Sequence, residues 1–237
     1  MTATLEREVK NGAARVFIVD DHPIVREGLA AQIATHPNLT LCGEAEEVPE
    51  ALMRIAEMKP DLVIIDISLR NGNGIDLVKR LKAKSPNLAI LVWSMYPEKL
   101  YAERALRAGA LGYINKGASA PKIMEAIQAV LGGRTFLSEE MSAKLLGRVV
   151  GAPNEAPCSY VEKLTDRELE AFELLGHGMT TQQIAVKMHV SPKTVETYRA
   201  RIKEKLGLTN AMELIQHAVQ WAMGGNENRQ SYQDARE

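Results

Sequence analysis

Two patterns of apolar residues divide the chain. Up to about residue 131, short apolar runs alternate with amphipathic stretches, whereas from residue 164 onward the apolar positions follow a helical period only. Runs this short and rich in Val and Ile predict strands of a parallel sheet that is buried on both faces. The stretches between them predict helices, as with Val25, Leu29 and Ile33 at i, i+4 and i+8. The predicted strands are residues 16–19, 39–42, 62–67, 89–93 and 112–114.

Five strands that alternate with five helices predict an α/β doubly wound, five-stranded parallel sheet, followed by a small all-α domain. After Gly132 and Gly133 the strand pattern stops, and Ser138 is a suitable N-cap for a short linker helix over residues 138–149. We therefore predict five parts: a flexible N-terminus at 1–14, the α/β domain at 15–131, a linker with a short helix at 132–163, the helical domain at 164–223 and a disordered tail at 224–237.

Composition narrows the class of protein. The 237 residues include 29 basic and 30 acidic side chains, a net charge of -1, which excludes a protein that coats nucleic acid indiscriminately. No apolar run approaches the roughly 20 residues of a membrane helix, and the first residues lack the apolar core of a secretory signal. Cys42 and Cys158 form no disulfide framework, so we expect free thiols, a cytoplasmic location and no membrane partner.

Polar side chains that could bind an ion or take part in a reaction lie at the ends of four predicted strands. Ligands of an open parallel sheet bind at the carboxyl ends of its strands. Carboxylates gathered there would repel one another, and Mg²⁺ relieves such repulsion while it keeps several waters. A lysine could hold a phosphate oxygen, and one aspartate could attack phosphorus to become an aspartyl phosphate. The residues are Asp20 and Asp21 after the first strand, Asp66 after the third, Ser94 at the fourth and Lys116 after the fifth.

Each of these residues alone has an ordinary explanation, as a helix cap, a turn residue or a solvated lysine. Their joint placement at different strand ends is far more specific. The motifs Val-Asp-Asp-His-Pro at 19–23, Asp-Leu-Val-Ile-Ile-Asp-Ile-Ser-Leu at 61–69, Ser-Met at 94–95 and Gly-Tyr-Ile-Asn-Lys at 112–116 resemble the flavodoxin-like receiver domain of bacterial response regulators. The His-Pro pair is similar to the NarL/FixJ subfamily.

This resemblance implies a role for each residue of the pocket. Asp66 would accept phosphate from a histidine kinase. Asp21, Asp66 and the backbone carbonyl of Ser68 would hold Mg²⁺, with Asp20 helping through a water. Lys116 would contact the phosphate, and Ser94 and Tyr113 would form a switch pair in which the hydroxyl moves to the phosphoryl group and the ring turns inward. We further expect Gly72 and Gly74 to permit the turn after Asp66 through positive φ angles.

The helical part contains strong helix starts. Thr165 with Glu168 three residues later predicts a capping box, and Ser191 followed by Pro192 predicts the start of a later helix. Two helices joined by a tight turn, the second beginning with Ser-Pro, predict a helix-turn-helix. Residues 187–205 carry six basic against two acidic side chains, while residues 162–173 carry five acidic against two basic. A basic helix exposed beside an acidic one suits a DNA duplex contact, although a solvated charged helix is the alternative.

Residues 164–208 resemble a LuxR-type DNA-binding domain, through Leu-Thr-Asp-Arg-Glu at 164–168, Val-Ser-Pro-Lys-Thr-Val-Glu-Thr-Tyr-Arg at 190–199 and Lys-Leu-Gly at 205–207. The resemblance implies a third helix that enters the major groove and a last helix, about 210–223, that mediates dimerisation. Side chains expected at base edges are Glu196, Thr197 and Ala200; those expected mostly at phosphates are Lys193, Arg199, Arg201 and Lys203, with Thr194 also in the DNA-binding set.

Together these features predict a phosphorylation-controlled, DNA-binding transcriptional regulator that forms a homodimer. Its expected partners are a histidine kinase and double-stranded DNA, with RNA polymerase as a further candidate, and its expected cofactor is Mg²⁺. It would be no enzyme beyond phosphorylating and dephosphorylating itself. Two alternatives stay open: a dimeric DNA-binding regulator with a vestigial or ligand-gated receiver, and a stand-alone Mg²⁺ phosphohydrolase.

Overall fold

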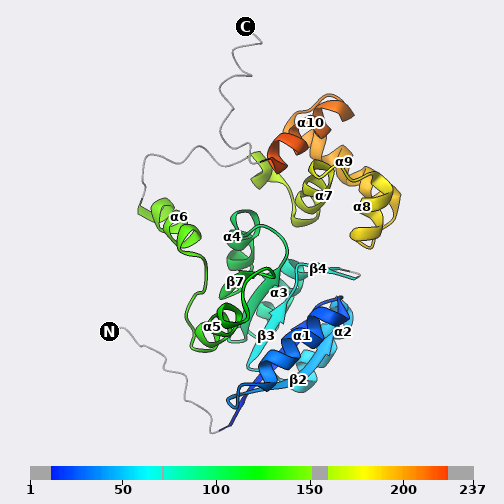
Figure 1. Ribbon diagram of the computed structural model, residues 1–237. Helices are drawn as coiled ribbons and strands as arrows, with labels where there is room; N and C mark the ends of the chain where they lie inside the picture. Colours follow the sequence, from blue (N-terminus) through cyan, green and yellow to red (C-terminus); the bar gives the residue numbers. More distant parts are fainter. Residues whose placement is uncertain (1–11, 71, 151–159, 224–237) are drawn as a thin grey trace. The chain divides into compact units, whose positions relative to one another are not determined.

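The computed structural model describes residues 12–70, 72–150 and 160–223 (Figure 1). The chain divides into two compact units, Met1–Ala152 and Pro153–Glu237, each with its own core. The predicted flexible N-terminus lies largely outside the described ranges, and the predicted tail lies wholly outside them. Of the helices that the structure describes, none is long and apolar enough to cross a lipid bilayer.

The first unit is built on a parallel sheet, as the sequence predicts. In the described part of the chain this sheet has five strands in the order β2-β1-β3-β6-β7, so the strand order reverses at β1 and β3. The predicted run 62–67 ends two residues early, because Ser68 and Leu69 pair antiparallel with Gly72 and Asn73 in a separate hairpin. The strands are β1 (Ala14–Val19), β2 (Leu39–Ala45), β3 (Leu62–Ile65), β4 (Ser68–Leu69), β5 (Gly72–Asn73), β6 (Ala89–Ser94) and β7 (Gly112–Asn115).

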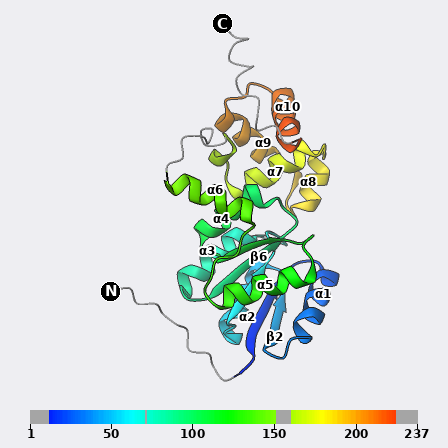
Figure 2. The same cartoon turned by 60° about the vertical axis from the view of Figure 1, so that its left-hand side comes forward.

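Helices cover both faces of the sheet because side chains alternate along each strand. Val16 and Ile18 of β1 point to one face, where Leu29 of α1 and Ile127 of α5 join the same buried cluster. Figure 2 shows α1 and α5 on the same side of the sheet. The central strands β3 and β6 are buried along their whole length, which explains why their sequences are continuous apolar runs. The helices of this part are α1 (Pro23–Ala34), α2 (Val48–Met58), α3 (Gly74–Lys84), α4 (Glu98–Ala108) and α5 (Ala120–Leu131).

The segment after α5 closes the open edge of the sheet. Phe136 forms an isolated parallel bridge with Gly112, and the backbone N–H of Tyr113 donates to the carbonyl of Phe136 over 2.9 Å. Helix α6 (Glu139–Val150) follows, and the Ser138 hydroxyl accepts from the N–H of Met141 at 3.1 Å, as expected of its N-cap. The linker therefore contains a helix, which lies within the first unit.

The second unit is helical throughout its described length. Three helices begin at threonine or serine caps, at Thr165, Thr180 and Ser191, and the first two are complete capping boxes. Leu169, Phe172 and Ile184 are buried in its core. Its elements are the 3₁₀ turn η1 (Tyr160–Lys163) and the helices α7 (Asp166–Gly176), α8 (Thr181–Lys187), α9 (Pro192–Leu206) and α10 (Ala211–Ala222).

Candidate functional site

The register of the sheet brings the predicted site residues to one edge. Val19 of β1 lies opposite Ile65 of β3, so Asp20 and Asp66 leave their strands side by side. The N–H of Asp66 donates to the carbonyl of Val19 at 2.9 Å. At β7, the N–H of Lys116 donates to the carbonyl of Ser94 at 2.9 Å. The ends of four strands, β1, β3, β6 and β7, thus converge, as the sequence predicts.

A buried lysine joins two of the carboxylates. The ammonium of Lys116 lies 2.6 Å from Asp20 Oδ2 and 2.7 Å from Asp66 Oδ2. Asp20 is 1% exposed and Asp66 4% exposed. Burial raises the pKa of Asp66, the Asp20 carboxylate raises it further, and Lys116 only partly opposes them. Burial disfavours the charged form of Lys116, but Asp66 and Asp20 outweigh it and raise the pKa of this lysine. The ammonium therefore stays charged.

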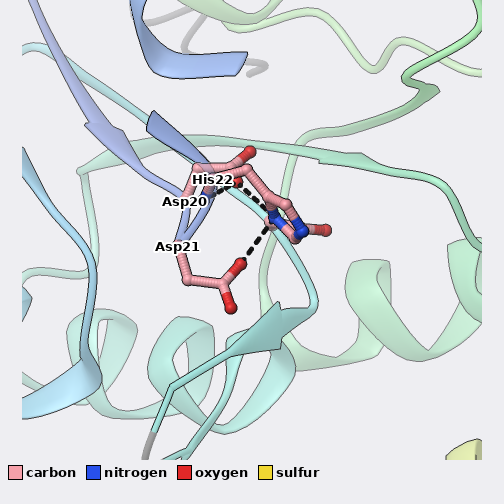
Figure 3. Close-up of side chains that lie close together, drawn as sticks. Asp20, Asp21 and His22 are labelled. Atoms are coloured by element: carbon pink, nitrogen blue, oxygen red, sulfur yellow. Dashed lines mark hydrogen bonds and ion pairs between the residues drawn. The ribbon is translucent and has the colours of Figure 1, made fainter. Parts of the chain in front are cut away.

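Asp21 lies at the same edge of the sheet, and we call Asp20, Asp21, Asp66 and Lys116 together the acidic pocket. His22 lies beside this pocket. Figure 3 shows the His22 imidazole beside both neighbouring aspartates. Its Nδ1 lies 2.7 Å from Asp21 Oδ1 and 3.3 Å from Asp20 Oδ1, and the His22 backbone N–H also donates to Asp20 Oδ1 at 3.0 Å. The imidazole itself is mostly exposed to solvent.

The donor set of this pocket fits a hard divalent cation. Ligand atoms of Asp20, Asp21, His22 and Asp66 all lie within 4.8 Å of one another. Three carboxylates against one ammonium leave an excess of negative charge in a buried place, which a divalent cation would neutralise. Carboxylate oxygens are the ligands that Mg²⁺ prefers. Ser68, whose carbonyl was the predicted further ligand, lies half-buried on β4.

The predicted switch residues lie next to this pocket. Ser94 lowers the pKa of Asp66, and its hydroxyl accepts from the backbone N–H of Tyr96 at 3.4 Å. Tyr113 is buried, and its hydroxyl donates to the backbone carbonyl of Tyr96 at 2.7 Å. The Tyr96 ring in turn lies 4.8 Å, centre to centre, from the ring of Tyr101 on α4. The Asp66 neighbourhood is thereby connected to α4 through three tyrosines.

Gly72 and Gly74 were predicted to adopt positive φ angles, and this prediction was wrong. Both positions need glycine because there is no room for a Cβ atom. Neither Gly72 nor Gly74 is among the glycines with positive φ. A Cβ on Gly74 would lie 2.0 Å from the backbone oxygen of Asp66, and one on Gly72 would lie 2.3 Å from Val48 Cγ2. Glycine is required because the turn after Asp66 passes against other backbone and side chains.

The third helix of the second unit, α9, presents polar and basic side chains to solvent. Lys193, Thr197, Ala200 and Arg201 are exposed at helical spacing, and we call these four residues the α9 outer face. Val195 and Ile202 point the other way, into the core. Four of the eight residues of the predicted DNA-binding set thus share one accessible face.

Other members of the predicted DNA-binding set contact the protein itself. The Arg199 guanidinium donates to Thr181 Oγ1 at 2.8 Å and to Glu196 Oε1 at 3.1 Å, and the Thr181 hydroxyl also donates to Glu196 Oε1 at 2.7 Å. This network ties α9 to the start of α8. Thr194 shares a hydroxyl hydrogen bond with the Ser191 cap, and Lys203 is half-buried.

Several charged side chains of α7 and α9 form ion pairs within the protein. Three acidic side chains of α7, Glu168, Glu170 and Glu173, are buried. Glu168 accepts from the ammonium of Lys205 at 2.6 Å, which removes Lys205 from the basic surface. Glu170 pairs with Arg167 at 2.9 Å. The sequence offers no short-range signal for the Glu168–Lys205 pair, because 37 residues separate its members.

Comparison with known proteins follows the division into two units. Residues 16–128 match the response regulator receiver domain, and residues 162–218 match the luxR family of bacterial regulatory proteins. DevR/DosR of Mycobacterium tuberculosis, a DNA-binding transcriptional activator, is 36% identical over 82% of this chain and 88% of its own length. The response regulator GacA of Pseudomonas protegens is 32% identical over 88% of this chain and 97% of its own length.

Solved structures of response regulators also resemble this chain. A two-component response regulator of the LuxR family from Aurantimonas is 32% identical, with a TM-score of 0.54, and covers 59% of this chain and 99% of its own. The response regulator RcsB of Salmonella typhimurium is 25% identical, with a TM-score of 0.54, over 87% of this chain and 98% of its own.

Proposed function

This chain belongs to the family of response regulators that join a receiver domain to a LuxR-type DNA-binding domain, and on that premise we propose that Asp66 is the residue whose phosphorylation controls DNA binding. The family is one of phosphorylation-controlled DNA-binding regulators and not of metabolic enzymes. The observation that carries the assignment is the buried Lys116, which reaches Asp20 and Asp66 from a third strand end.

In the proposed reaction, a carboxylate oxygen of Asp66 attacks phosphorus and forms a P–O bond. The bond from phosphorus to the leaving group breaks, and the leaving group is the imidazole of a phosphohistidine on a kinase or the acetate of acetyl phosphate. The protein needs little covalent chemistry beyond this attack, so positioning and charge stabilisation do most of the work. Lys116, now paired with Asp66, would then hold an oxygen of the phosphoryl group. Hydrolysis by water at the same phosphorus would regenerate Asp66.

Asp21, Asp66 and the Ser68 carbonyl would hold Mg²⁺, with Asp20 contributing through a water. When bound, the ion supplies positive charge against the negative charge of the transferring phosphoryl group. Asp20 keeps Lys116 in the pocket through their 2.6 Å contact.

We infer that Ser94 and Tyr113 transmit the phosphorylated state. Ser94 ends β6, the strand beside β3 that leads to Asp66, and its effect on the pKa of Asp66 supports a position from which it could contact a phosphoryl group there. Any displacement of Ser94 pulls on the segment that carries the Tyr96 carbonyl, which holds the Tyr113 hydroxyl. The inward position of Tyr113 is therefore coupled to Ser94 through the backbone of Tyr96, whose N–H donates to Ser94 Oγ at 3.4 Å.

The α9 outer face would dock in the major groove of DNA. Glu196, Thr197 and Ala200 would meet base edges, and Ala200 can offer only a methyl contact. The remaining members of the predicted set would position the helix: Lys193, Arg201 and Lys203 at phosphates, Arg199 at a phosphate or through its contact with Glu196, and Thr194 at the helix start.

Two such units would bind one DNA site as a homodimer. Helix α10 keeps Met212 and Ile215 exposed on the side away from its buried Leu214 and Ala218, which supports its predicted role in dimerisation. The proposed partners are a histidine kinase and double-stranded DNA in the cytoplasm, with RNA polymerase as a further candidate.

The test is incubation with Mg²⁺ and acetyl phosphate, followed by intact-mass measurement of the wild type and Asp66→Asn. We expect one added phosphoryl group on the wild type and none on the variant. An equal gain by the variant would show that Asp66 is not the acceptor, and no gain by the wild type would favour the phosphorylation-independent regulator. Sustained multiple turnover of ordinary phosphate esters would favour the phosphohydrolase instead.

A further inference from the structure

Arg26, one turn into α1, contacts three segments around the acidic pocket. Its Nη1 donates to the backbone carbonyl of Asp20 at 2.7 Å. Its Nε donates to Glu44 Oε2 at 2.9 Å, and its Nη2 donates to Glu46 Oε1 at 2.7 Å. The side chain is only 12% exposed. One guanidinium therefore joins the β1–α1 turn, the end of β2 and the turn after β2.

A second arginine extends this connection to the other side of the pocket. Glu46 also pairs with Arg70 through Oε2 at 3.3 Å. The neighbouring Glu47 forms an isolated parallel bridge with Arg70. Arg70 follows β4 in the turn that leaves Asp66. Contacts thus run from Asp20 through Arg26, Glu46 and Arg70 to the segment beyond Asp66.

The bond to the Asp20 carbonyl is the contact least replaceable by water, because Asp20 is buried whereas Glu44 and Glu46 are about one-third exposed. Burial disfavours the charge of Arg26, but Glu46 and Glu44 outweigh it and raise the pKa of this guanidinium. Its charge is balanced by these two glutamates. Its effect on the pocket is therefore one of geometry more than of added positive charge.

We propose that Arg26 is a positioning residue for the phosphorylation site: it fixes the turn that carries Asp20 and Asp21 and, through Glu46 and Arg70, the turn that follows Asp66. The proposal rests on the proposed function, in which these carboxylates hold Mg²⁺. Three carboxylates that repel one another need such restraint from outside the pocket. Replacement of residues that orient metal ligands in this way commonly lowers metal affinity by about 10- to 100-fold.

Arg26→Lys separates the geometry from the charge. Lysine keeps the positive charge. Its single ammonium cannot replace the planar guanidinium, whose separate N–H groups reach acceptors on three segments. Arg54→Ala is the matched control. Arg54 lies in the same charged cluster, pairs with Glu50 at 3.1 Å and stacks over the Phe17 ring, and among the described residues its contacts do not include Asp20.

The experiment measures Mg²⁺ affinity of the full chain through Trp93, in a Trp221→Phe background. Trp93 directly precedes Ser94, and the Lys116 ammonium lies 5.6 Å from the centre of its ring, so a cation that rearranges the Lys116 contacts should change its emission. Thermal melts without Mg²⁺ establish that each variant is folded. Phosphoryl uptake from acetyl phosphate is measured alongside as a function of Mg²⁺ concentration.

We expect Arg26→Lys to weaken Mg²⁺ binding by about tenfold or more, and Arg54→Ala by less than about twofold. Phosphoryl uptake by Arg26→Lys should recover at high Mg²⁺, because Asp66 itself is intact. Glu46→Gln, which leaves Arg26 its contact with Asp20, should give a smaller loss and provides a second, milder variant.

Mg²⁺ affinity of Arg26→Lys equal to that of Arg54→Ala would overturn the inference and leave the proposed function standing. Loss of thermal stability by Arg26→Lys without loss of Mg²⁺ affinity would also overturn it, since the role would then be structural only. Absence of both Mg²⁺ binding and phosphoryl uptake by the parent protein would overturn the proposed function and the inference with it.

Discussion

Replacement of Lys205 by methionine should destabilise the helical unit without removing a DNA contact. Lys205 is one of six basic residues between 187 and 205, and its sequence position alone groups it with the phosphate-binding side chains. In the structure its ammonium instead lies 2.6 Å from the buried carboxylate of Glu168 on α7. The same carboxylate accepts the N–H of Thr165 in the capping box, so it holds both the start of α7 and the contact with α9.

The size of the effect follows from burial. Removing one partner of a fully buried ion pair costs about 3–5 kcal/mol. Lys205 is 34% exposed, so water already screens part of the interaction, and we expect a loss of about 1–2 kcal/mol, near the value for a hydrogen bond to a charged group. For a unit of this size that corresponds to a fall in Tm of roughly 5–15 °C.

The loss should depend on pH. Burial alone would raise the pKa of Glu168, but the hydrogen bonds from Lys205 and Thr165 outweigh it and hold this pKa below its usual value. A carboxylate with a lowered pKa in the folded state contributes stability above its unfolded pKa of about 4.3, and that stability disappears as pH falls through the folded value. The difference between wild type and Lys205→Met should therefore be full at neutral pH and shrink below about pH 4.

The assay is thermal unfolding followed by Trp221 emission in a Trp93→Phe background, because Trp221 then reports the helical unit alone. Arg201→Met is the control, since Arg201 is exposed on the same helix. Arg201→Met should keep its Tm and reduce the slope of log affinity against log salt by about 0.9, whereas Lys205→Met should keep the slope. An unchanged Tm together with a reduced salt slope of DNA binding for Lys205→Met would refute the reasoning, because Lys205 would then contact DNA and not stabilise the helical unit.

Three further variants test other parts of the account. Gly74→Ala would place a Cβ 2.0 Å from the Asp66 carbonyl oxygen, so phosphoryl uptake measured by intact mass should slow by about 100-fold, while Gly28→Ala, which meets no atom within 4 Å, should not; equal rates would contradict the steric explanation. Lys193→Ala should reduce the slope of log affinity against log salt by about 0.9 for every duplex sequence tested. A loss of affinity for some sequences only would instead indicate a base contact. Ser94→Ala should still gain a phosphoryl group but lose the accompanying rise in DNA affinity, and a retained rise would exclude Ser94 from the switch.

Local patterns were sufficient to predict the strands and the residues that end them. Asp20 and Asp66 directly follow runs of buried apolar residues, and Lys116 follows the last residue of β7. Because the carboxyl ends of parallel strands share one edge, their convergence could be predicted without the structure. The caps at Thr165 and Ser191 were equally predictable, because capping depends on side chains three residues apart. Both successes rest on interactions that a short window of sequence contains.

Long-range pairing between charged side chains could not be predicted in the same way. Arg26 meets Glu44 and Glu46, 18 and 20 residues away, and Lys205 meets Glu168, 37 residues away. Nothing in a charge count distinguishes these partners from solvated side chains, because their contacts depend on how helices and turns pack. The space needed at Gly74 is likewise a property of the fold, since the atom it would meet belongs to Asp66.

The most direct test of the central claim compares DNA affinity with and without a phosphodonor. The wild type and Asp66→Asn are titrated, with Mg²⁺ present throughout, against a labelled duplex selected from a random pool, first alone and then with acetyl phosphate. We predict that the donor tightens binding of the wild type by about tenfold or more and leaves Asp66→Asn unchanged. Equal affinities of the two proteins under both conditions, or an equal gain by the variant, would contradict control of DNA binding through Asp66.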